Sequence, residues 1–156
     1  MPTAMPEKPE ERHRQMGAAT FNRAWELIEK PNRSPEEDAE MLATTFASRY
    51  HWAQVGGDEQ RATGEWQIAH IASLLHLPDL ALRYARSTLE VTERNGWGDW
   101  RLASAYEGMA RAHAAAGDAA ERDRHVALSK EILETVEDPE DRNQIAEQLQ
   151  TVPGYR

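Results

Sequence analysis

The chain has 156 residues, of which 40% are hydrophobic and 29% are charged, and it contains no cysteine. This length suits one domain of ~100–200 residues, and the composition is typical of a folded globular protein. The lack of cysteine excludes disulfide frameworks, thiolate catalysis and cysteine-based zinc or iron–sulfur sites. It also fits a reducing compartment. We therefore predict a single domain over residues 1–156, which the helix signals and the internal repeat below make a helical-repeat domain.

Acidic residues outnumber basic ones, with 27 Asp and Glu against 18 Lys and Arg, and the net charge is −9. Nucleic-acid binders use a basic surface to neutralise phosphates, and anionic membranes attract the same kind of surface. We therefore expect neither a nucleic acid nor a membrane as a partner. The charge leaves basic proteins, basic peptides and neutral molecules as possible partners.

Both ends of the chain carry signals of irregular structure. The first residues, MPTAMPEKPEERHRQM, are rich in proline and charge and lack the apolar core of a signal peptide. No run approaches the ~18 apolar residues of a membrane helix. We expect flexible tails at residues 1–7 and 152–156 and a cytoplasmic protein. The abundant arginine and alanine are typical of bacterial chains from GC-rich genomes.

Helix start and stop signals recur along the chain, whereas no run alternates apolar and polar residues as a strand does. Ser34 before Pro35, followed by Glu37, is a typical helix start, and Asp138 before Pro139 repeats it. Further starts are expected at Asp99 and Asp118, and stops at Pro31, Gly56, Pro78, Asn95 and Gly117. These signals divide the chain into about seven helices, roughly 8–30, 35–55, 60–77, 79–95, 99–116, 118–136 and 139–150.

Two segments of the chain repeat each other. Residues 65–96 and 106–138 each read as a helix, a tight turn and a second helix. At one constant offset, Ala69 pairs with Ala110 and Thr88 pairs with Ser129. A single hairpin of this kind cannot bury its apolar face alone, so it stacks on its neighbours. Because the loops are short, neighbouring helices should be antiparallel, and we predict an all-α stack of helical hairpins.

The repeat resembles that of the tetratricopeptide repeat family. In the segment AYEGMARAHAAAGDAAERDRHVALSKEI, Tyr106 and Ala110 stand at a large and a small core position, and Gly117-Asp118 forms the turn. The resemblance covers about residues 60–138 and departs from the family in repeat spacing and in the closing proline. It implies a right-handed stack of antiparallel hairpins, and non-catalytic binding of a peptide or partner protein on a concave face.

In that family, first-helix residues one turn apart line the concave face. The resemblance places five residues of this chain there: Trp66, His70, Ser73, Glu107 and Arg111. Trp66 would be an apolar anchor, and Arg111 would hold a carboxylate through two hydrogen bonds. Because Glu107 and Arg111 are an i,i+4 pair, they could instead satisfy each other.

Two other functions stay open. Four polar residues lie near core-facing positions and could line an inter-helical pocket of a small-molecule-binding protein or enzyme: His51, Glu65, His70 and His113. The same side chains could equally form one structural salt-bridge or hydrogen-bond network. A third function is an oligomerisation module, and the pattern is compatible with a homo-oligomer.

Familiar catalytic and metal-binding motifs are missing from the sequence. It contains no glycine-rich phosphate loop after a strand, no G-x-S-x-G and no H-E-x-x-H. No two of the six histidines stand three or four residues apart, so no single helix presents a two-histidine clamp. We therefore expect no enzyme activity, no cofactor and no stoichiometric metal, although histidines from separate helices could still converge.

Overall fold

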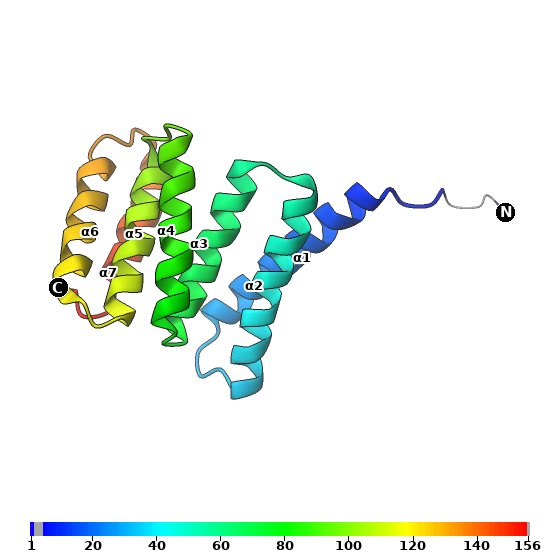
Figure 1. The fold of residues 1–156 in the computed structure, drawn as a ribbon, viewed down its shortest axis with the longest axis horizontal. Helices are drawn as coiled ribbons and strands as arrows, with labels where there is room; N and C mark the ends of the chain where they lie inside the picture. The colour runs from blue at the N-terminus through cyan, green and yellow to red at the C-terminus, as the bar shows by residue number, and fades with distance from the viewer. Residues whose placement is uncertain (2–4, 156) are drawn as a thin grey trace. The chain divides into compact units, whose positions relative to one another are not determined.

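The computed structural model describes residues 1 and 5–155, and these residues form seven α-helices and no strand (Figure 1). The helices are α1 (Pro9–Glu29), α2 (Pro35–Val55), α3 (Asp58–Leu74), α4 (Pro78–Arg94), α5 (Trp100–Ala115), α6 (Ala119–Leu133) and α7 (Pro139–Gln150). The prediction of an all-α fold with about seven helices is confirmed. The end of α3 comes earlier than predicted because His76 adopts a positive φ of 56°, which a helix does not allow.

The chain forms two compact units, residues 1–64 and residues 65–156, and the boundary falls inside α3. The first unit contains α1, α2 and the first turns of α3, whereas the second contains the rest of α3 and α4 to α7. The single domain over residues 1–156, the right-handed stacking and the tetratricopeptide resemblance stay predictions. Among the described residues, no helix has the length and apolar character needed to cross a membrane.

Capping side chains fix where several helices begin. The Ser34 hydroxyl accepts a hydrogen bond from the Glu37 backbone N–H at 3.1 Å, and the Glu37 carboxylate accepts one from the Ser34 N–H at 3.1 Å. This reciprocal capping box satisfies two backbone donors that the first turn of a helix leaves without partners. Asp99, Asp118 and Asp138 cap α5, α6 and α7 in the same way with one bond each. The predicted helix starts are therefore confirmed.

Removing the Ser34 hydroxyl should weaken the start of α2 measurably. We expect Ser34→Ala to lower the free energy of unfolding by about 1 kcal/mol, because one helix-end N–H loses its acceptor. Urea unfolding followed by circular dichroism measures this change. Ser34→Asp, which keeps a capping oxygen, is the matched control and should stay close to the wild type. Equal losses in both variants would contradict the capping role.

In the first unit α1 packs along α2. Its buried apolar side chains include Ala24, Leu27 and Met41. The buried Ser48 hydroxyl donates a hydrogen bond to the Gly17 carbonyl at 2.8 Å and so links the two helices. A side chain at Gly17 would place its Cβ only 2.7 Å from the Trp52 indole nitrogen. Glycine at this position therefore lets the Trp52 ring lie against α1.

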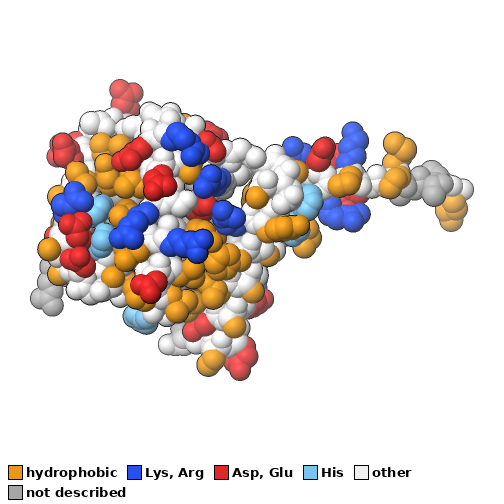
Figure 2. Space-filling model, viewed as in Figure 1, with side chains coloured by type: hydrophobic (Ala, Val, Ile, Leu, Met, Phe, Trp, Pro, Cys, Tyr) orange, Lys and Arg blue, Asp and Glu red, His pale blue; other side chains and the backbone are white. Residues whose placement is uncertain are grey.

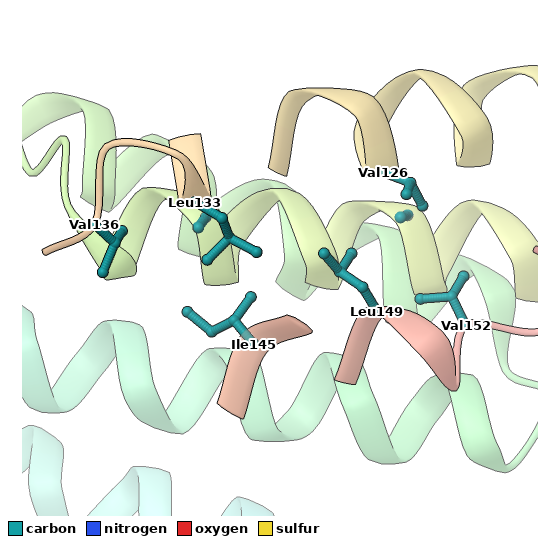
Figure 3. Packing of buried hydrophobic residues seen from close by; sticks show 8 residues of the cluster. Val126, Leu133, Val136, Ile145, Leu149 and Val152 are labelled. Carbon is teal, nitrogen blue, oxygen red and sulfur yellow. The ribbon is translucent and has the colours of Figure 1, made fainter. Parts of the chain in front are cut away.

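In the second unit α4 lies beside α5, and α5 beside α6 (Figure 1). Helix α7 packs against both α5 and α6. Figure 3 shows the apolar cluster between them, in which six side chains are labelled: Val126, Leu133, Val136, Ile145, Leu149 and Val152. Burial of this face holds the last helix on the α5–α6 hairpin, since apolar contact is the main favourable term in helix packing.

The predicted flexible tail at residues 152–156 was wrong for residues 152–155. Val152 is buried in the cluster of α5, α6 and α7, and Tyr155 packs against the same cluster. The Lys130 amine also donates a hydrogen bond to the Tyr155 hydroxyl. Helix α7 ends at Gln150, but the residues after it still contribute apolar surface to the core. In the predicted tail at 1–7, residues 1 and 5–7 form no helix, and residues 2–4, like residue 156, lie outside the described residues.

Candidate functional site

The structure brings the predicted groove residues of the second unit together, but it buries them. Trp66 and His70, from α3, stack with ring centroids 5.0 Å apart. Glu107 and Arg111, from α5, form an ion pair with an N–O distance of 2.7 Å. Their exposed fractions are 9% for both Trp66 and His70, 0% for Glu107 and 4% for Arg111. Ser73 is also buried, and its hydroxyl donates to the Ala69 carbonyl at 2.8 Å.

Arg111 connects α5 to the C-terminal end of α7. Besides its bond to Glu107, the guanidinium donates to the Gln148 carbonyl at 3.0 Å and to the Thr151 hydroxyl at 2.7 Å. The carbonyl groups at a helix C-terminus carry partial negative charge, which a guanidinium complements. Arg111 thus directs its hydrogen-bond donors to groups of the same chain. This arrangement agrees with the alternative in which Glu107 and Arg111 pair with each other.

Burial sets the protonation of the neighbouring groups. Loss of solvation, together with the positive charge of Arg111, lowers the pKa of His70 from 6.5 to about 3. His70 is therefore a neutral imidazole at neutral pH. Burial raises the pKa of Glu107, and the Arg111 guanidinium opposes that rise. The Trp66 indole N–H donates a hydrogen bond to the Ser104 carbonyl at 3.1 Å, and this bond connects α3 to α5.

The residues of the alternative pocket have different neighbours. Glu65 accepts a hydrogen bond from the Ser87 hydroxyl at 2.5 Å. His113 stacks on His125 with ring centroids 5.0 Å apart. In the first unit, Nδ1 of His51 lies 2.9 Å from Nδ1 of His13. Each of these groups therefore has a contact of its own within its unit.

A hollow in the first unit was not predicted. Its volume is about 320 Å³, and it lies between α1, α2 and the first turns of α3. Phe21 and Trp52 give it aromatic walls, with Ala18 and Gly64 beside them. The polar lining residues are Asn22, Glu59, Gln60 and Thr63. The hollow thus combines an aromatic interior with side chains that can form hydrogen bonds at several points.

A second unpredicted cluster lies in the α5–α6 hairpin. His113, Glu121 and His125 each offer one possible metal-ligand atom, and these atoms lie within 4.8 Å of one another. Burial lowers the pKa of His113, and the neighbouring His125 lowers it further. The sequence signal for this cluster is the i,i+4 spacing of Glu121 and His125 on one helix. Its third member comes from the other helix of the hairpin.

On the face drawn in Figure 2, several Lys and Arg side chains lie near one another, and Asp and Glu side chains lie beside and around them. Comparison with known protein families and with characterised proteins found no match to this chain.

Proposed function

We propose that this is a non-catalytic cytoplasmic binding protein that recognises a peptide segment of a partner protein through the hollow of the first unit. The observation that carries the proposal is the pairing of Phe21 and Trp52 walls with polar lining residues. A volume of about 320 Å³ lies at the lower end of the range for ligand pockets. It suits one large side chain of a peptide better than a bulky cofactor.

The chemistry of the hollow indicates which peptide fits. Aromatic walls favour an aromatic or branched aliphatic anchor, because such side chains remove most apolar area from water. Asn22, Gln60 and Thr63 can bond to the peptide backbone beside that anchor. Glu59 in the lining and the net charge of −9 favour basic flanking residues, since opposite charge speeds encounter and selects partners. The proposed ligand is therefore a basic peptide with one apolar anchor.

The ionisable groups of the second unit support a non-catalytic role. A general acid or base works best with a pKa near the operating pH. His70, with a pKa of about 3, lies far from that condition. Glu107 is paired with Arg111, and Arg111 is bonded to α7. These contacts favour a buried structural network over a polar pocket as the role of these groups.

Filling the hollow should abolish peptide binding while the fold stays intact. Ala18 lines the hollow and is exposed, so Ala18→Phe should occupy the space at little cost in stability. The probe is a labelled nine-residue peptide with a central tryptophan between lysines, followed by fluorescence anisotropy. We expect Ala18→Phe to weaken its binding by at least about thirtyfold, which corresponds to roughly 2 kcal/mol for a lost anchor.

Ala19→Phe is the matched control, because Ala19 is the exposed neighbour on α1 and is not among the lining residues. It should bind the peptide as the wild type does. A peptide with alanine at the centre, or with glutamates in place of the lysines, should bind weakly to all three proteins. Binding of the lysine–tryptophan peptide that is unchanged by Ala18→Phe would contradict the proposed site. Binding of free indole but of no peptide would favour the small-molecule alternative.

A further inference from the structure

The α5–α6 hairpin brings two histidines and one glutamate close together: His113, Glu121 and His125. His113 lies in the last turns of α5, and Glu121 and His125 lie one turn apart near the start of α6. The tight turn between the helices is made possible by Gly117, whose φ is 77°. This turn holds the two helices side by side, so that histidines from different helices face each other. No single helix carries two histidines at metal-binding spacing, which is why we expected no metal. In the hairpin, the two histidines come from two different helices.

We propose that His113, Glu121 and His125 form a binding site for a divalent transition-metal ion of the zinc class. Two imidazoles and one carboxylate are ligands that Zn²⁺ and its neighbours prefer, whereas Ca²⁺ and Mg²⁺ prefer oxygen alone. The ligand atoms lie within 4.8 Å of one another. Nitrogen and oxygen ligands on tetrahedral zinc are about 3.4 Å apart, given bonds of about 2.0–2.1 Å. The ligand atoms therefore have to approach one another by up to about 1.4 Å to bind one ion, and one coordination position stays open for water or a ligand.

His125 is already arranged as metal-binding histidines are. Its Nδ1 lies 2.7 Å from the backbone carbonyl oxygen of Glu121. A carbonyl oxygen only accepts hydrogen bonds, so Nδ1 carries the hydrogen, and Nε2 has the lone pair that can bind a metal. The Glu121 carboxylate lies 3.7 Å from Nδ1, so it has to turn toward Nε2 to share an ion with it. An N–H bond from the non-ligating nitrogen to a carbonyl commonly fixes the tautomer and ring orientation at metal sites. The imidazole is also buried, which limits its conformational freedom.

The carboxylate gives the ion a path to the site. The Glu121 side chain is 39% exposed, whereas both histidines are buried. The charged groups around the cluster act in both directions: Asp118 favours positive charge at His113, and Arg86 opposes it. Arg124 lies 3.2 Å from the Glu121 carboxylate, and its own side chain is 60% exposed. An exposed ion pair of this kind is weak, so a metal ion can displace Arg124 at little cost.

The test is a titration of the full chain with Zn²⁺ by calorimetry, together with elemental analysis after dialysis. We expect one Zn²⁺ per chain. Glu121→Gln keeps the shape of the side chain but removes a charged ligand, and we expect it to raise the dissociation constant by at least tenfold. Co²⁺ should give visible bands that reflect imidazole and carboxylate ligation, and these bands should change in Glu121→Gln. Zn²⁺ should also raise the melting temperature of the wild type more than that of Glu121→Gln.

Two controls separate this site from other zinc contacts. Glu131→Gln changes an exposed glutamate on the same helix, and it should bind Zn²⁺ as the wild type does. His51→Gln removes one member of the histidine pair in the first unit, and it should also leave the affinity unchanged. The proposal is overturned if the wild type binds no Zn²⁺ or if Glu121→Gln binds it equally well. Loss of binding in His51→Gln alone would likewise overturn it, because the metal would then belong to His13 and His51.

Discussion

Replacing Arg111 with alanine is expected to lower the free energy of unfolding by about 3–5 kcal/mol, as is usual when one partner of a buried ion pair is removed. The change leaves the fully buried Glu107 carboxylate without its counter-charge. It also removes the hydrogen bonds to Gln148 and Thr151 that connect α5 to the end of α7. Urea unfolding gives the loss of stability, and amide hydrogen exchange should show the largest loss of protection in α7.

Two further variants decide why Arg111 matters. In Arg124→Ala the lost ion pair is exposed, so the change in unfolding free energy should stay within about 0.5 kcal/mol. Glu107→Leu combined with Arg111→Met removes both buried charges, and it should recover part of the stability that Arg111→Ala loses. If Arg111→Ala left the stability unchanged but abolished binding of a partner, Arg111 would belong to a binding surface, as the family resemblance implies.

Acidification should destabilise the protein through His70. The folded-state pKa is about 3 and the ordinary value is 6.5, so the unfolded chain binds the proton more tightly between these values. The contribution of His70 to stability is therefore complete above pH 6.5, and it is lost as the pH falls toward 3. At pH 4.5 the loss amounts to about 2.7 kcal/mol, since each pKa unit is worth about 1.36 kcal/mol.

The measurement compares urea unfolding of the wild type and His70→Gln at pH 7.0 and pH 4.5. The glutamine side chain does not titrate, so the unfolding free energy of the variant should fall by about 2.7 kcal/mol less than that of the wild type. His76→Gln, at an exposed position, should follow the wild-type pH dependence. An equal fall in the wild type and His70→Gln would show that His70 does not hold a neutral imidazole in the folded state.

The helices could be read from the sequence because their signals are local. Ser34 with Glu37, and the aspartates before α5, α6 and α7, act on backbone groups within one turn. The residues Pro78 and Gly117 stop or turn the chain by their own backbone geometry. The same locality explains the error at the C-terminus. Helix α7 does end before Pro153 and Gly154, but the burial of Val152 depends on α5 and α6, which are distant in the sequence.

The candidate sites depended on neighbours that the sequence does not show. Family resemblance brought Trp66, His70, Glu107 and Arg111 to one place, and they do lie together in the second unit. It did not show that α7 covers Arg111, because helix packing is decided by apolar faces summed over whole elements. The hollow beside Trp52 was likewise not predicted, since its lining comes from three different helices.

The sequence by itself determined that this protein is all-helical, acidic and without cysteine chemistry, since composition and helix-end signals are properties of single residues and single turns. Only the tertiary structure decided which polar groups are used internally and which remain available. It buried His70 and Glu107 with Arg111, left a hollow at Phe21 and Trp52, and brought His113 to Glu121 and His125. The physical reason is that solvation, ion pairing and ligand geometry depend on distances between helices, and those distances are set by packing of the whole chain.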